Sequence, residues 1–319
     1  MTGGLQVFFR YRQLEIKLHR LRLFLLLPLL PIFAPDFAPC NHAPPEPAEA
    51  FEIRSGERVR DWCERLESDG SAVTCAAVRR SAARLEPGRE GWFGLLSGNG
   101  NRYEFLPPPI ARLNRFEGLF VPGRYQRRAD ETVDDLILRL LAKTEARLRD
   151  SPRDDDPYNV PGLEFTGYRQ MTLASIVEKE AASNRDYERV AAVFLNRLRN
   201  NEVLGSCPTV EYALGYHRPF LLYEDLKLDS PYNVYKRRGL PPTPIAFFSD
   251  EAFDAVRRPI DSADYYFVYD WTNGELVFAE DYSDHRRNSE LARERFINRF
   301  GKDRLYQKYE GLFYELPGS

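Results

Sequence analysis

The segment 171–180, with the sequence MTLASIVEKE, places one carboxylate on the apolar face of a predicted helix. At about 100° per residue, Ile176 and Val177 share a face, and Glu180 lies three residues after Val177 on that same face. Glu178 points toward nearly the opposite side. Because burying a charged carboxylate is costly, a Glu on an apolar face is either paired with a cation or held partly protonated. A partly protonated Glu is a suitable general acid, so Glu180 is the candidate catalytic residue. A structural Glu paired with a buried Arg is the alternative.

Two segments farther along the chain have the composition of a cleft wall. Ser230–Tyr235 (SPYNVY) is a turn rich in hydrogen-bonding aromatic residues, and Gly239–Ile245 (GLPPTPI) has few backbone donors and cannot form a central strand. Loops on a rigid scaffold hold many binding sites. We therefore expect these segments to line a cleft, although composition alone also fits an ordinary surface loop.

Several other catalytic arrangements are absent from the sequence. It has no GxSxG, no P-loop and no GxGxxG in a βαβ setting, and its four His residues form no HExxH. The four cysteines lack metal-ligand spacing, so we expect neither a metal nor another cofactor. Cys207 with a His partner is an alternative nucleophile that nothing local supports. The net charge of −3 gives no reason to expect a nucleic-acid partner.

Residues 1–40 have the composition of an export or anchoring segment. Basic residues and almost no acids precede the apolar run Leu23–Ala34, which is shorter than a spanning helix needs. The basic flank favours a cytoplasmic N-terminus with the rest of the chain exported. Pro28 and Pro31 argue against a buried apolar helix. We expect a membrane tether, followed by a stiff Pro- and Ala-rich linker over 41–50.

The pattern of residues 51–95 predicts a small βαα module, and that of residues 102–309 predicts a larger domain of mixed helices and strands. In the module, a short strand and a turn at Ser55-Gly56 precede two helical patterns. Cys63 and Cys75 are close enough for a local disulfide if the chain is exported, and two buried thiols are the alternative. In the larger domain, we predict one helix over Thr132–Arg149 and another that starts at a capping box, Ser183–Asp186, and ends at about Asn200. A third helix is predicted over about Ser283–Gly301. A hairpin is predicted from Tyr265–Tyr269 and Glu275–Phe278. The fold class is α+β.

Several motifs, in their order and spacing, resemble those of the YceG-like (MltG-type) endolytic murein transglycosylases. They are Leu173–Glu180, Val193–Leu198 (VFLNRL), Pro208–Val210, Ser230–Tyr235, Gly239–Ala246, Tyr266–Val268 and His285. The resemblance covers about residues 102–305, and the module resembles the LysM-like segment of that family. Phe116–Tyr125 is similar to the family's EGYLFPDTY stretch but lacks its Asp. The chain also departs from the pattern at Cys207, where the family usually has an Asp.

The resemblance implies an enzyme of the bacterial inner membrane, anchored by a single pass, with its catalytic domain on the periplasmic side. Such an enzyme cuts peptidoglycan glycan strands internally, ends nascent strands, and has cell-wall synthases of the elongation machinery as partners. Glu180 matches the family's catalytic Glu, the residue that helix geometry also selects. It would cleave the MurNAc–GlcNAc bond with formation of a 1,6-anhydroMurNAc end. The residues that we expect to contact substrate are Glu178, Asn196, Tyr232, Asn233, Tyr235, Thr243 and His285.

Two other functions also fit the sequence. A muramidase-type hydrolase would need a second essential carboxylate beside Glu180, for which Asp229, Asp264 and Glu117 are candidates. A non-catalytic peptidoglycan-binding scaffold for cell-wall synthases would not need Glu180 at all. The apolar surroundings expected for Glu180 predict a raised pKa, as an acid catalyst requires.

Overall fold

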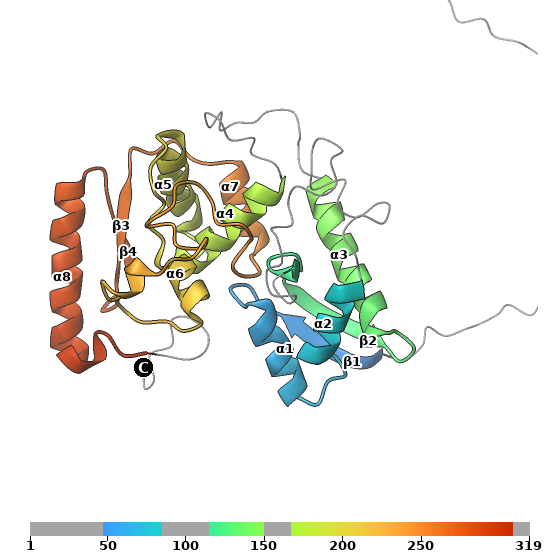
Figure 1. Ribbon diagram of the computed structural model, residues 1–319. Helices are drawn as coiled ribbons and strands as arrows, with labels where there is room; N and C mark the ends of the chain where they lie inside the picture. The colour runs from blue at the N-terminus through green and yellow to red at the C-terminus, as the bar shows by residue number, and fades with distance from the viewer. Residues whose placement is uncertain (1–46, 85–114, 150–166, 309–319) are drawn as a thin grey trace, which may run out of the picture. The chain divides into compact units, whose positions relative to one another are not determined.

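A computed structural model describes residues 47–84, 115–149 and 167–308 (Figure 1). The predicted tether over residues 1–40 lies outside these ranges. Within them, no helix combines the length and the apolar character needed to cross a membrane. The helices are α1 (Val59–Ser68), α2 (Cys75–Arg84), α3 (Val133–Arg149), α4 (Gly167–Glu180), α5 (Tyr187–Arg199), α6 (Cys207–Leu214), α7 (Asp250–Arg257) and α8 (Tyr282–Phe300), with short 3-10 turns η2 (Asp225–Lys227) and η3 (Lys302–Arg304). The strands are β1 (Pro47–Ile53), β2 (Gly123–Arg128), β3 (Tyr266–Asp270) and β4 (Glu275–Ala279).

The small module is completed by a strand from farther along the chain. β1 pairs antiparallel with β2, so that Phe51 lies opposite Tyr125. The sequence did not predict β2, because its residues (GRYQRR) are mostly polar and Tyr125 alone is buried. β1 also begins at Pro47, inside the segment predicted as linker. The observed unit therefore contains the predicted βαα order as β1–α1–α2 and adds β2, which we did not predict.

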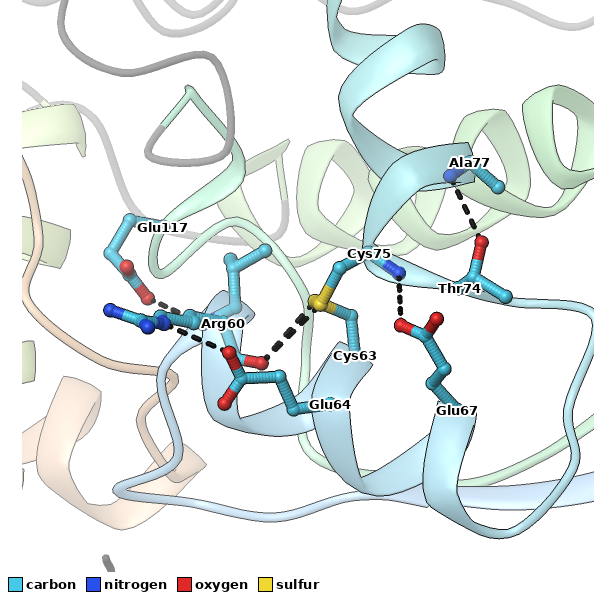
Figure 2. The surroundings of a disulfide bond; sticks show 9 residues. Arg60, Cys63, Glu64, Glu67, Thr74, Cys75, Ala77 and Glu117 are labelled. Carbon is cyan, nitrogen blue, oxygen red and sulfur yellow. Dashed lines mark hydrogen bonds and ion pairs between the residues drawn. A yellow bond between two sulfur atoms is a disulfide. The ribbon is translucent and has the colours of Figure 1, made fainter. Parts of the chain in front are cut away.

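Cys63 and Cys75 form a disulfide between α1 and the first residue of α2. This decides between the two alternatives that the sequence left open. The carboxylate of Glu67, also on α1, accepts a hydrogen bond from the Cys75 N–H (Figure 2), and the two atoms are 3.3 Å apart. Closing a loop of this length is worth about 3 kcal/mol through the entropy of the unfolded chain. The bridge therefore stabilises the packing of α1 against α2.

The module and the following residues share one hydrophobic core. The Trp62 ring forms T-shaped pairs with Phe120 and Phe247, with ring centroids 5.5 Å and 6.3 Å from its own. The turn after β1 pairs with the segment before α7, since the Gly56 N–H donates to the Phe247 carbonyl at 2.8 Å and the Phe247 N–H donates to the Glu57 carbonyl at 2.9 Å. The boundary predicted between residues 95 and 102 lies outside the described residues.

α4 is buried on almost every side. α5, α6 and α7 pack against it, and every residue from Met171 to Val177 is buried. Lys179 is also buried and donates to the Gly56 carbonyl at 3.0 Å, which connects α4 to the module. The single apolar face predicted for this helix was thus too simple, because the sequence does not show how many elements surround it.

The predicted C-terminal elements are confirmed. β3 and β4 form an antiparallel hairpin in which Tyr266 lies opposite Ala279. Gly274 in its turn has a φ of 73°, which favours glycine. α8 packs on the hairpin and starts after Asp281, whose carboxylate accepts from the Asp284 N–H at 2.9 Å. α5 begins at Tyr187 rather than at the predicted capping box, where Ser183 and Asp186 hydrogen-bond within a turn.

Candidate active site

Glu180 is the last residue of α4 and lines a cleft of about 620 Å³. The cleft walls come from the end of α4, from α5, from the start of α6, from β3 and from α8. Aromatic side chains make up much of the lining, and they include Phe220, Tyr235, Tyr266, Tyr269, Trp271 and Tyr282. Aromatic rings with polar tips suit a ligand that has both apolar faces and hydroxyl groups.

The surroundings of Glu180 hold its two protonation states close in free energy. Burial, and then the nearby negative charge of Glu211, favour the neutral acid, while the Ser206 hydroxyl, Arg197 and the Cys207 backbone N–H favour the carboxylate. Burial is the largest effect and raises the pKa of Glu180 to about 7. The raised pKa predicted from the sequence is confirmed. A group with this pKa can both give and accept a proton near neutral pH.

The start of α6 faces the Glu180 carboxyl group. Ser206 is the N-cap residue, and Cys207 opens the helix. Backbone N–H groups at a helix N-terminus carry a partial positive charge. This position therefore stabilises Glu180 when it has lost its proton.

Arg197 joins the elements around Glu180. Its side chain donates to the carbonyls of Tyr265, at 2.7 Å, and Leu204. These bonds connect α5 to the residue before β3 and to the loop before α6. The guanidinium carbon lies 5.2 Å from the ring centroid of Tyr266. Arg197 therefore positions both walls of the cleft and places a cation near the carboxylate.

Tyr266 and His285 form a stacked pair in the cleft. Their ring centroids are 5.2 Å apart with an interplanar angle of 20°. Burial and Arg197 lower the pKa of His285, so its imidazole is neutral at physiological pH. A neutral imidazole can give or accept a hydrogen bond with a ligand.

Cys207 lines the cleft, and its Sγ lies 3.0 Å from the Tyr235 hydroxyl. Burial and the neighbouring Glu180 raise the pKa of this thiol. Because the thiolate is the nucleophilic form, a thiol held neutral is a poor nucleophile. The arrangement therefore gives no support to a cysteine-based mechanism.

Comparisons with known proteins assign the chain to a family. The model of the YceG-like family matches residues 41–291, which is most of the chain. The chain belongs to the YceG-like family.

Relatives and a solved structure agree with this assignment. This YceG-like chain is 33% identical over 183 residues to the endolytic murein transglycosylase of Bacillus subtilis, a match that covers 57% of the chain and 48% of the relative. The endolytic murein transglycosylase of Streptococcus pneumoniae is 35% identical over 181 residues, covering 54% of the chain and 32% of the relative. The chain thus spans half or less of the length of these relatives. The crystal structure of a YceG-like protein from Listeria monocytogenes superposes with a TM-score of 0.59 at 26% identity and covers 75% of each chain.

In this YceG-like chain, three of the eight residues predicted for the site line the cleft. They are Glu180, Tyr235 and His285. Glu178 faces away from it, and its carboxylate accepts hydrogen bonds from the Tyr187 hydroxyl at 3.0 Å and from the Ser249 N–H and hydroxyl at 2.9 Å and 2.6 Å. Glu178 therefore connects α4 to α5 and to the start of α7.

The other four predicted residues are not among those that line the cleft, and their side chains form hydrogen bonds within the protein. Asn233 is fully buried and donates to the carbonyls of Leu226 and Leu228. The Asn196 amide donates to two carbonyls in the loop before β3. The Tyr232 and Thr243 hydroxyls are buried and hydrogen-bonded to each other at 2.8 Å. Direct contact of these four with substrate stays a prediction, and their geometry favours a positioning role.

None of the acids suggested as a second catalytic carboxylate lines the cleft. Asp229 pairs with Arg237 at the surface, Asp264 pairs with Arg189, and Glu117 accepts from the Val59 N–H and the Tyr212 hydroxyl.

The other acids that line the cleft beside Glu180 are Glu202 and Glu211, and neither was predicted from the sequence. Glu211 could have been found, because it follows Cys207 by four residues, which places it on the same face of a helix. We find no cluster of three or more His, Cys, Asp or Glu side chains that could hold a metal ion in the ranges that the structure describes.

Proposed function

We propose that this chain is an endolytic lytic transglycosylase that acts on peptidoglycan, with Glu180 as its catalytic acid and base. The observation that carries the proposal is the half-buried Glu180 carboxyl, whose pKa is about 7, on the wall of an aromatic cleft. Membership of the YceG-like family and the names of the matched relatives support the same reaction.

One carboxylic acid is enough for this reaction because the substrate supplies the nucleophile. Glu180 donates its proton to the oxygen that joins C1 of N-acetylmuramic acid to N-acetylglucosamine, and the C1–O bond breaks. The resulting carboxylate removes the proton from the C6 hydroxyl of the same muramic residue, and O6 bonds to C1. The products are a free N-acetylglucosamine end and a 1,6-anhydro end. Glu180 has regained its proton, and no water is consumed.

The groups around Glu180 suit both halves of this cycle. Burial and Glu211 favour the protonated acid that begins it. Arg197, the Ser206 hydroxyl and the Cys207 N–H stabilise the carboxylate that forms when the bond breaks. The site can therefore give a proton and take one back with a small free-energy difference between the two states.

The proposal extends to the cellular setting. Residues 1–40 would tether the chain to the inner membrane with its catalytic domain on the periplasmic side, where it would end nascent strands beside cell-wall synthases. The Cys63–Cys75 disulfide supports this placement, because disulfides persist in oxidising compartments. The β1–α1–α2–β2 unit would be the LysM-like module.

A muramidase-type hydrolase is the second candidate, and one observation favours it. Glu211 supplies another carboxylate in the cleft that contains Glu180. In a hydrolase, such a carboxylate would serve as nucleophile or would activate water. The products would then have reducing ends rather than anhydro ends.

Digestion of purified peptidoglycan tests the proposal. The full chain and its Glu180→Gln variant are each incubated with the polymer, and the fragments are identified by mass. Anhydro ends, which are lighter than reducing ends by one water, are expected with the wild type alone. Reducing ends would instead support the hydrolase. Binding without fragments from either protein would support the non-catalytic scaffold.

A further inference from the structure

Glu211 is a buried acid that the mechanism above uses only for its charge. It lies on α6, one turn after Cys207, and is 4% exposed. It lines the Glu180 cleft and also a smaller pocket of about 40 Å³, whose other charged residues include Arg58 and Lys179. Glu211 therefore forms part of the wall between the catalytic cleft and this second pocket.

The two carboxylate oxygens of Glu211 differ in their surroundings. Oε1 accepts a hydrogen bond from the Arg218 N–H at 3.0 Å and lies 3.7 Å from Nδ1 of His217. Oε2 is buried and has no hydrogen-bond partner among the residues that the structure describes. Leaving a buried carboxylate oxygen unsatisfied is costly, so such atoms are usually completed by a ligand or an ordered water.

The cations near Glu211 already have other partners. Arg58 forms two hydrogen bonds of 2.7 Å with Asp61, and Lys179 donates to the Gly56 carbonyl. The Arg218 guanidinium pairs with Asp225, with a nitrogen–oxygen distance of 3.1 Å. A ligand that completes Glu211 therefore has to bring its own donor, and the cleft already suits sugars.

We propose that Glu211 is a substrate-binding residue whose Oε2 accepts a hydrogen bond from a hydroxyl or acetamido N–H of a sugar bound beside Glu180. This inference rests on the proposed function. The hydrogen bond from the sugar to Glu211 would hold the substrate in the cleft, whereas Glu180 would transfer the proton.

Glu211→Gln separates this role from a structural one. The amide oxygen of Gln can still accept from the Arg218 N–H, which keeps the turn after α6 in place. The amide NH₂ then replaces Oε2, so an acceptor becomes a donor facing the donor of the sugar. A merely structural Glu211 would tolerate this change, whereas a substrate acceptor would not.

The test measures equilibrium binding of a peptidoglycan tetrasaccharide by calorimetry. The background is Glu180→Gln in the full chain, which prevents cleavage during the titration. Adding Glu211→Gln is expected to raise the Kd about 10- to 100-fold, the range for one charge-assisted hydrogen bond. Adding Glu188→Gln, an exposed change on α5, is the matched control and should leave the Kd unaltered.

The outcomes separate the inference from the proposed function. An unchanged Kd with Glu211→Gln, while wild-type protein still yields anhydro ends, would overturn the inference alone. No binding in the Glu180→Gln background and no fragments from wild type would overturn both. If the Gln variant is unfolded by circular dichroism, Glu211→Asp replaces it, because the shorter side chain withdraws the acceptor and should raise the Kd similarly.

Discussion

Two glutamates on one helix show how surroundings decide what a residue does. Glu178 and Glu180 are separated by one residue on α4, yet they face different neighbours. Glu178 accepts hydrogen bonds from α5 and from the start of α7, whereas Glu180 faces an aromatic cleft. The carboxylate with several donors is held in place, and the one in the cleft is free to exchange a proton.

The pH dependence of cleavage should reveal the charge of Glu211. Because Glu180 has to be protonated to begin the reaction, kcat/KM should fall about tenfold per pH unit above its pKa of about 7. Among the groups that act on Glu180, Glu211 raises its pKa and Arg197 lowers it. Glu211→Gln should therefore move the midpoint of the fall to lower pH.

The profile is measured by fragment release between about pH 5 and pH 9. This interval extends from near the ordinary pKa of a carboxyl group to well above the raised pKa of Glu180. Glu188→Gln removes an equal charge from the exposed side of α5 and serves as control. A midpoint that Glu211→Gln leaves unmoved would show that the two carboxylates do not interact.

The helices α3, α4, α5 and α8 and the hairpin could be predicted because their signals are local, whereas α6 and α7 were not predicted. The apolar spacing in α3 and the Asn-Gly turn between β3 and β4 each lie within a single stretch of sequence. β2 could not be predicted in the same way, since its polar residues become a strand only by pairing with β1.

The difference between local and tertiary signals also explains which residues of the site could be predicted. Glu180 could be selected from helix geometry and motif, whereas Arg197 and Ser206 reach it only through tertiary packing. Asn233 shows what the sequence leaves out. We predicted a sugar contact for this residue, which stays a prediction, and its amide N–H groups donate to the carbonyls of Leu226 and Leu228.

Glu178 should matter more for the packing of elements than for catalysis. Glu178→Ala removes the acceptor for the Ser249 N–H at the start of α7, and leaving such a group unsatisfied costs about 1–3 kcal/mol. We expect a lower free energy of unfolding in urea, with kcat/KM per folded molecule close to wild type. Glu188→Ala on the exposed side of α5 controls for the loss of a Glu. A large loss of kcat/KM at unchanged stability would restore Glu178 as a substrate contact.

In the molecule as a whole, the module contacts α4, the helix that ends at Glu180, directly. Lys179, between the two glutamates of α4, donates to Gly56 in the turn after β1. Phe247 pairs with the same turn through its backbone and contacts Trp62 through its ring. The residues beside Glu180 therefore depend on the module for their packing.

Because of this shared core, we expect loss of the Cys63–Cys75 disulfide to lower the stability of both the module and α4. Because α1 and α2 bury their apolar residues in the same core as α4, destabilising the module should destabilise everything that unfolds with it. Replacing both cysteines by Ala removes a bridge with a sequence separation of 12, and the expected loss is about 3 kcal/mol. Urea unfolding of the double variant, followed by both tryptophan fluorescence and far-UV circular dichroism, should show one coincident transition at a lower midpoint.

Cys207→Ala, which breaks no disulfide, is the control for loss of a thiol. Two separate transitions, with the early one confined to the module, would mean that the module folds independently and that its contacts with Lys179 and Phe247 contribute little to the stability of the site.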